Sequence, residues 1–259
     1  MIRAPNDRAL QDDVIRALAD APYRASADWR RRALADPDRM DRYARFLARH
    51  FYYERIVHFF KYSRALARVT SRAPEGVLKS PAFDALLPAL VLGSRETASA
   101  VARLVTAHVA VGAVPVPYLF DLLRYEAAMM VVEAGPRVWR DSPDAEEAGS
   151  ERYRPETVEG TVLLDLAFDL PAVLPKLLQA WTDVPQAPQR RTKLLVARSP
   201  HGRVAVATSD ESVAAVIDLA DGKRTLEELA VGTGVPVAEL RQTLEGLVDL
   251  GAVRFSTGS

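Results

Sequence analysis

The sequence predicts a mainly α-helical protein in which an N-terminal helical domain is followed by a small C-terminal winged helix-turn-helix domain of the α+β class. Two observations favour this fold. Long segments with helical apolar periodicity fill most of the chain, and residues 193–255 show the pattern of a hairpin followed by three capped helices. The 259 residues are 49% hydrophobic and 26% charged with zero net charge, as in ordinary globular proteins.

The C-terminal segment begins with two short runs rich in β-branched residues, 193–198 and 203–208, joined by the turn-forming sequence Ser199-Pro-His-Gly. Three helices are predicted to follow, because apolar residues recur at helical spacing. Their boundaries carry the expected capping residues: Asp210, Thr225 with Glu228 three residues later, and Gly251. A short strand at 252–255 closes the predicted winged helix-turn-helix.

A winged helix suggests DNA binding, but the charge of this one disfavours it. From Leu194 to Phe255 there are six basic and nine acidic residues, whereas a DNA reader needs Lys and Arg for phosphates. The third helix carries Arg241 against three acidic residues. We therefore favour peptide binding, in which an extended peptide adds a strand to the hairpin and rests on the third helix.

The domain boundaries are predicted from composition. Residues 182–192 are polar and contain two prolines, so they are predicted to link a helical domain at 1–181 to the winged helix domain at 193–255. Helices are predicted within 7–35, 38–69, 95–111 and 118–134, and an acidic loop over 141–160.

The predicted helix over 38–69 is rich in aromatic residues. Its periodic apolar positions indicate a helix packed on at least one side: Tyr43, Phe46, Leu47, His50, Phe51, Val57, Phe60 and Leu66. Residues 1–70 hold 15 basic and 9 acidic residues, so RNA binding by stacking is an alternative. We prefer a core role for these aromatic residues, because periodic aromatic stripes usually face the interior.

His50, Glu54 and His58 lie four residues apart on this helix, near one face, and two imidazoles with a carboxylate suit iron or zinc. The alternative is that the histidines are partly buried polar groups and Glu54 pairs with an arginine. We predict no metal in this chain, because no matching ligand pair stands on another helix.

The hairpin, SDESVAAVIDLADGKRTLEELA and VPVAELRQTLEGLVDLGAV together resemble the peptide-recognition elements of pathways that modify ribosomally made peptides. In that family a leader peptide pairs with the last strand before the first helix and lies against the third helix. The resemblance implies a leader-binding site at these residues: Arg203, Val204, Ala205, Val206, Ala207, Leu240, Arg241, Leu244 and Leu247.

A second resemblance lies in PYLFDLLRYEAAMM, which follows a proline-rich turn. It is similar to the helical domain of the partner proteins of multinuclear non-heme iron-dependent oxidative enzymes, including the partner subunit of methanobactin synthesis. Tyr125 departs from that pattern, in which an aliphatic residue usually stands at this position. The resemblance implies an enzyme-docking surface that includes Tyr118, Asp121, Arg124 and Tyr125, with iron held by the partner enzyme and no cofactor in this chain.

Together, the two resemblances predict a non-catalytic subunit that forms a heterodimer with an iron-dependent oxidative enzyme and presents a leader-bound precursor peptide to it. No known catalytic motif is present, and no partner of the nucleic acid or membrane type is expected. Without an apolar signal segment, the expected location is the cytoplasm. The alternatives are a winged-helix transcriptional regulator with a helical sensor and a helical metal-dependent oxygenase.

Overall fold

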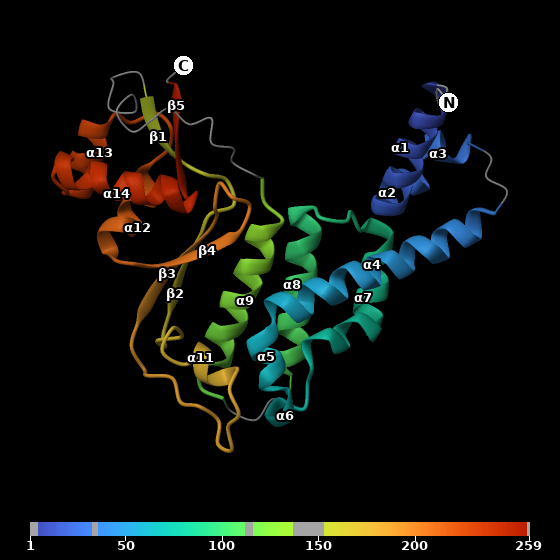
Figure 1. The fold of residues 1–259 in the computed structure, drawn as a ribbon, viewed down its shortest axis with the longest axis horizontal. Helices are drawn as coiled ribbons and strands as arrows, with labels where there is room; N and C mark the ends of the chain where they lie inside the picture. The colour runs from blue at the N-terminus through green and yellow to red at the C-terminus, as the bar shows by residue number, and fades with distance from the viewer. Residues whose placement is uncertain (1–4, 33–35, 112–115, 137–152, 258–259) are drawn as a thin grey trace. The chain divides into compact units, whose positions relative to one another are not determined.

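The computed structural model describes residues 5–32, 36–111, 116–136 and 153–257 (Figure 1). The chain is mainly helical, with small antiparallel sheets in its C-terminal part, as predicted. It divides into two compact units, residues 1–116 and 117–259.

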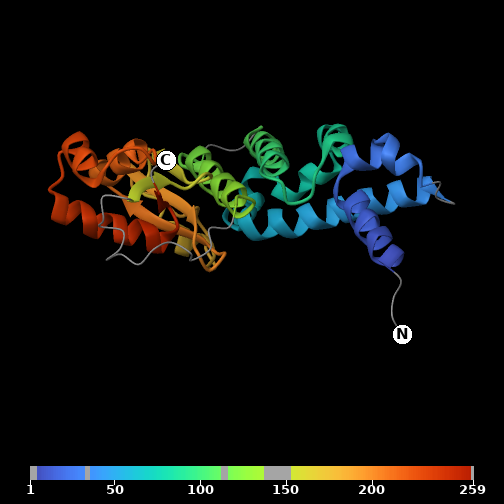
Figure 2. The same cartoon turned by 90° about the horizontal axis from the view of Figure 1, so that it is seen from above.

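The first unit has helices and no β-strand among its described residues, apart from one isolated bridge between Asp20 and Val91. Its elements are α1 (Pro5–Ala19), α2 (Ala21–Ala25), α3 (Ala27–Arg30), α4 (Pro37–Phe59), α5 (Lys61–Ala65), α6 (Ala67–Thr70), η1 (Pro74–Lys79), α7 (Pro81–Leu86), η2 (Leu87–Ala89) and α8 (Arg95–Ala110). The longest, α4, packs against α1 (Figure 2). It also packs against η1, which packs in turn against α8.

Helix α4 begins where the sequence predicts. The Asp36 side chain accepts the backbone N–H of Arg39, and Pro37 stands at the first helical position. The predicted single helix over 38–69 is wrong at its C-terminal end, because Phe60 leaves helical geometry and two short helices follow.

The buried face of α4 is also not the predicted one. Its buried residues are Ala44, Ala48, Tyr52, Ile56 and Phe59, whereas Tyr43 and Phe46 are exposed. This second set, which includes two alanines, repeats with the same helical period as the predicted one, so periodicity alone did not distinguish the two faces. The core role predicted for Tyr43 and Phe46 is therefore wrong.

The second unit contains a 15-residue helix, a four-residue helix, two small sheets and three consecutive helices near the C-terminus. Its elements are α9 (Leu119–Glu133), β1 (Tyr153–Thr157), β2 (Val162–Leu166), α11 (Leu174–Leu177), β3 (Thr192–Arg198), β4 (Val204–Ser209), α12 (Glu211–Leu219), α13 (Leu226–Thr233), α14 (Val237–Leu250) and β5 (Val253–Thr257). The predicted hairpin and the three helices after it are confirmed, with Asp210, Thr225 and Gly251 at the predicted caps.

Strand pairing corrects three predictions. The order β2-β3-β4 makes a three-stranded antiparallel sheet, and β1 pairs with β5 in a second sheet. The closing strand β5 therefore does not join the hairpin. Residues 153–157 form a strand, although they fall in the predicted loop over 141–160, whose first part lies outside the described residues. Contacts also place the boundary between units after residue 116, not at 182–192, because β1 and β2 pair with strands beyond that segment.

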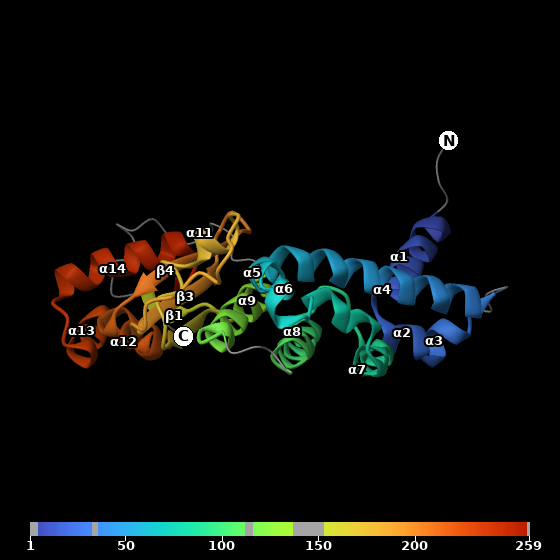
Figure 3. The ribbon, with the colours of Figure 1, turned by 90° about the horizontal axis from the view of Figure 1, so that it is seen from below.

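The core of the second unit lies on the two faces of β3. Leu195 and Ala197 belong to a cluster built with α12, α13 and α14. Helix α9 contacts β2, β3 and β4 and lies beside the sheet (Figure 3). Residues 194–197 are all buried, so this strand shows no apolar–polar alternation.

Within the described residues, no helix combines the length and apolar character that crossing a membrane requires.

Candidate peptide-binding edge

The turn between β3 and β4 fixes the register of the hairpin. The Gly202 N–H donates to the Ser199 carbonyl across 2.8 Å, and Gly202 has a φ of 78°, in the left-handed region. The Ser199 N–H then donates to the Arg203 carbonyl, also across 2.8 Å. This is a three-residue loop with a glycine bulge, which places Ser199 opposite Arg203 in a hydrogen-bonded pair.

Hydrogen-bonded and non-bonded pairs alternate along an antiparallel ladder. Because Ser199 and Arg203 are bonded, the next bonded pairs are Ala197 with Ala205 and Leu195 with Ala207. The intervening residues of β4 direct their N–H and C=O groups away from β3; they are Val204, Val206 and Thr208.

Strand β4 is an edge of its sheet. Its only strand partner among the described residues is β3, whose other side is occupied by β2. Val206 is 37% exposed, and Arg203 and Thr208 are also exposed. The three alternate residues Val204, Val206 and Thr208 thus present six outward main-chain groups, three N–H and three C=O, to an extended peptide.

The two faces of the sheet beside this edge are covered by different helices. Val206 pairs with Val196 and so lies on the face of the sheet that α9 contacts. Ala205 and Ala207 lie on the opposite face with Leu195 and Ala197, toward the cluster with α12 to α14. Alternate side chains of an added strand would therefore meet different surroundings.

The predicted residues of the third helix do not reach this edge. Leu240, Leu244 and Leu247 are 0, 1 and 5% exposed and lie in the core cluster. Their side chains pack against the sheet within this cluster, so they cannot contact a peptide at the edge of β4 directly. Arg241, on the same helix, is exposed. The structure thus places Val204 to Ala207 on one edge strand, with Arg203 directly before it, and separates all five from the three leucines.

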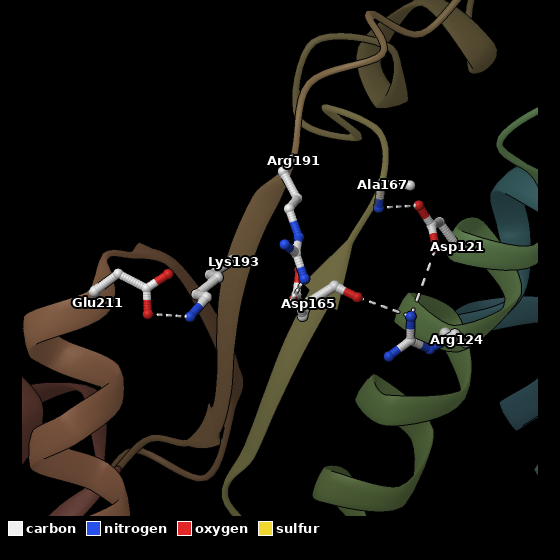
Figure 4. Close-up of polar contacts among 7 residues, drawn as sticks. All are labelled: Asp121, Arg124, Asp165, Ala167, Arg191, Lys193 and Glu211. Carbon is white, nitrogen blue, oxygen red and sulfur yellow. Dashed lines mark hydrogen bonds and ion pairs between the residues drawn. The ribbon is translucent and has the colours of Figure 1, made fainter.

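Two ion pairs lie where β3 begins (Figure 4). Lys193 at the start of β3 pairs with Glu211 in the first turn of α12. Arg191 makes a two-pronged contact with the Asp165 carboxylate of β2, at 3.2 and 2.8 Å. Neither pair includes a residue of β4, and the Arg191 and Glu211 side chains are 81 and 86% exposed, so these pairs contribute little to the stability of the edge.

Three of the four residues predicted to dock an enzyme are buried in the second unit. Tyr118, Asp121 and Tyr125 are 1, 6 and 7% exposed. The Asp121 carboxylate accepts the N–H groups of Ala167 and Phe168. The Arg124 guanidinium donates to the Asp165 carbonyl across 2.8 Å and lies 3.6 Å from Asp121 (Figure 4). Three of the four side chains thus serve internal packing in this structure.

Tyr118 shows the effect of this burial. Its hydroxyl donates to the Pro185 carbonyl across 2.7 Å. Desolvation raises the pKa of Tyr118 to about 12, because a buried phenolate loses its hydration.

The alternative metal ligands lie along one side of α4. His50 Nε2 is 3.3 Å from a Glu54 carboxylate oxygen, and both side chains are more than half exposed. The His58 ring packs against Phe59 at a centroid distance of 4.7 Å. Among the residues that the structure describes, no three His, Asp or Glu side chains are grouped so that they could hold a metal ion.

Two parts of this edge were missed by the sequence interpretation. Thr208 belongs to the outward-facing set, and the alternation of the ladder from the glycine turn could have indicated it. Strand β2 makes β4 an edge rather than one arm of a free hairpin, and its five residues carry no signal that specifies their partner 30 residues later.

Comparison of the chain with models of known protein families gives no match, and a search of curated proteins gives no significant match.

Proposed function

We propose that this protein is a non-catalytic partner subunit that captures the leader of a ribosomally made precursor peptide on β4 and presents the peptide to an iron-dependent oxidative enzyme. In this proposal the hairpin and α12 to α14 act as a winged helix-turn-helix module that binds peptide instead of DNA. The iron belongs to the partner enzyme. The enzyme half of the proposal follows from the resemblance of residues 117–130 to partner proteins of such enzymes.

The observation that carries the peptide half is the unpaired edge of β4, directly before α12. Val204, Val206 and Thr208 present outward main-chain groups there, and strand addition uses such groups without regard to peptide sequence. At about 1 kcal/mol net for each hydrogen bond, six bonds contribute about 6 kcal/mol before the cost of ordering the peptide. Side chains of the peptide must therefore supply the remaining affinity and the specificity.

A DNA-binding regulator is less well supported. The second unit holds 15 basic and 22 acidic residues, a net charge of −7. In α14, Arg241 stands against Glu239, Glu245 and Asp249. A phosphate backbone would be repelled by this unit, whereas a leader with basic residues would be attracted.

The test is amide-resolved hydrogen exchange of the full chain, with and without synthetic peptides that correspond to the N-terminal halves of short reading frames beside its gene. Strand addition protects the outward amides of Val204, Val206 and Thr208, which are otherwise open to solvent. The amides of Ala205 and Ala207 point toward β3 and provide an internal control. Binding that protects only residues outside β4 contradicts the proposal, as does a failure of every such peptide to bind.

A further inference from the structure

Helix α4 carries a second aromatic face that its own unit does not bury. Tyr43, Phe46 and Tyr53 are 52, 61 and 43% exposed, and the His50 side chain is 58% exposed. The rings follow one another along the helix: Tyr43 and Phe46 have centroids 6.4 Å apart, and Phe46 and His50 have centroids 6.2 Å apart with planes at 3°. A row of exposed rings this long is unusual on the surface of a soluble unit.

The spacing of this face is that of a helix–helix seam. Tyr43, Phe46, His50, Tyr53 and Val57 are separated alternately by three and four residues, which is the a/d pattern of coiled coils. On a helix with 100° per residue, these positions lie opposite the buried set of Ala44, Ala48, Tyr52, Ile56 and Phe59. α4 therefore has two apolar faces, and the outer one has the geometry to receive another helix.

Charge around this face indicates the chemistry of that helix. Arg39 and Arg42 flank its first turns, and neither guanidinium has a hydrogen-bond or ion-pair partner among the described residues. Glu54 at the other end is held by His50 at 3.3 Å. The first unit as a whole contains 19 basic and 12 acidic residues, a net charge of +7. Like charge opposes pairing of this face with the same face of a second copy, and it favours an acidic partner.

We infer that the outer face of α4, defined by Tyr43, Phe46, His50, Tyr53 and Val57, docks a helix of another protein whose apolar seam is flanked by Asp and Glu. The inference rests on the proposed function in one respect, because it takes that protein to be the modifying enzyme. It replaces Tyr118, Asp121 and Tyr125, which are buried, as the surface of first contact.

The experiment uses the tagged full chain in its source cells with the photoreactive substitution Phe46→benzoylphenylalanine. The matched control is the same substitution at Phe120, an exposed phenylalanine on α9 beside the other predicted docking residues. After irradiation and purification, mass spectrometry maps the crosslinks. The expected result is a crosslink from position 46 to a helix with acidic residues beside its apolar seam, in a second protein, and little crosslinking from position 120.

The second measurement is the affinity of the purified chain for the purified protein that it crosslinks to. Phe46→Ala is expected to weaken binding at least tenfold, since exposed aromatic anchors dominate interfaces, and Phe120→Ala to leave it unchanged. Arg39→Glu with Arg42→Glu is expected to weaken binding further and to reduce its dependence on salt. Because all these side chains are exposed, circular dichroism and melting curves should match those of the parent chain.

The outcomes separate the two proposals. If position 46 crosslinks to an acidic helix of a protein that contains no iron, the inference about α4 stands. The part of the proposed function that names an iron enzyme as the partner is then overturned. An iron enzyme that crosslinks from position 120 but not 46, or that binds Phe46→Ala normally, overturns the inference alone. A crosslink from position 46 to a second copy or to residues 117–259 also overturns it, and so does recovery of the chain without any partner.

Discussion

The carboxylate of Asp121 in α9 accepts the backbone N–H of Ala167 across 2.7 Å, just after β2 ends. The same oxygen accepts the N–H of Phe168 at 3.1 Å, so one side chain holds the exit of β2 against α9. We expect Asp121→Ala to destabilise the second unit by about 2–3 kcal/mol, since it removes two hydrogen bonds to a buried charge. Urea unfolding followed by circular dichroism measures this loss.

Two further variants calibrate the Asp121 result. Asp121→Asn keeps an oxygen acceptor without the charge and is expected to lose about half as much stability. Asp183→Ala removes an exposed carboxylate and is expected to change stability by less than about 0.5 kcal/mol. If Asp121→Ala were as mild as Asp183→Ala, the anchoring role of this carboxylate would be refuted.

Gly251 ends α14 at a point of close backbone approach. Its φ is +81°, and a Cβ there would lie 2.3 Å from the Arg198 carbonyl oxygen of β3. Gly234 ends α13 with a similar φ of +70° but has no atom within 4 Å of such a Cβ. Left-handed strain costs about 1–2 kcal/mol in both, so Gly234→Ala measures the strain alone.

We therefore expect Gly251→Ala to destabilise the second unit by more than about 3 kcal/mol, because the clash with rigid backbone adds to the strain. Thermal and urea unfolding of the two variants, side by side with the parent chain, check this difference. Equal losses in the two variants would mean that the contact between α14 and β3 tolerates a side chain.

The local features of this fold were predictable because their signals lie within a few residues. The Asp36-Pro37 start of α4, the Thr225–Glu228 capping box and the glycine turn before β4 are all set by neighbouring side chains. Pairing of β1 with β5 joins segments about 100 residues apart, and five-residue strands do not specify such distant partners.

Helix α4 shows a second kind of limit. Periodicity identifies an apolar face, but both faces of α4 repeat with the same period and differ only in phase. The sequence therefore could not indicate that Ala48 and Tyr52 are covered while Phe46 remains exposed. In the candidate site, too, some residues could be predicted from local sequence and others could not. The edge residues of β4 followed from the hairpin pattern, whereas the burial of Leu240 and Leu244 depends on contacts with strands and helices distant in sequence.

The raised pKa of Tyr118 has a consequence at high pH. Because its folded pKa of about 12 lies above the usual value of 10, the stability that the neutral phenol provides is complete below pH 10 and is lost as pH rises through 12. Among the eight tyrosines, Tyr118 should ionise late in an absorbance titration at tyrosinate wavelengths.

Tyr118→Phe identifies the signal. The variant should lose one late-titrating chromophore and unfold less steeply with pH between 10 and 12. At neutral pH it should be about 1 kcal/mol less stable, through loss of the hydrogen bond to the Pro185 carbonyl. If the parent and variant curves differed by a tyrosine that titrates near pH 10, the hydroxyl would not be desolvated.

Proline substitutions in β4 separate peptide binding from folding. The N–H of Val206 points outward, so Val206→Pro removes a donor at the free edge and leaves the ladder with β3 intact. We expect this variant to fold with near-parental stability and to bind a leader peptide at least tenfold more weakly in fluorescence polarisation. Ala205→Pro is the opposite case, because its N–H points toward Ala197, and its loss should destabilise the hairpin itself. A Val206→Pro chain that binds like the parent would exclude strand addition at this edge, since no extended peptide can pair through a missing N–H and past a proline ring.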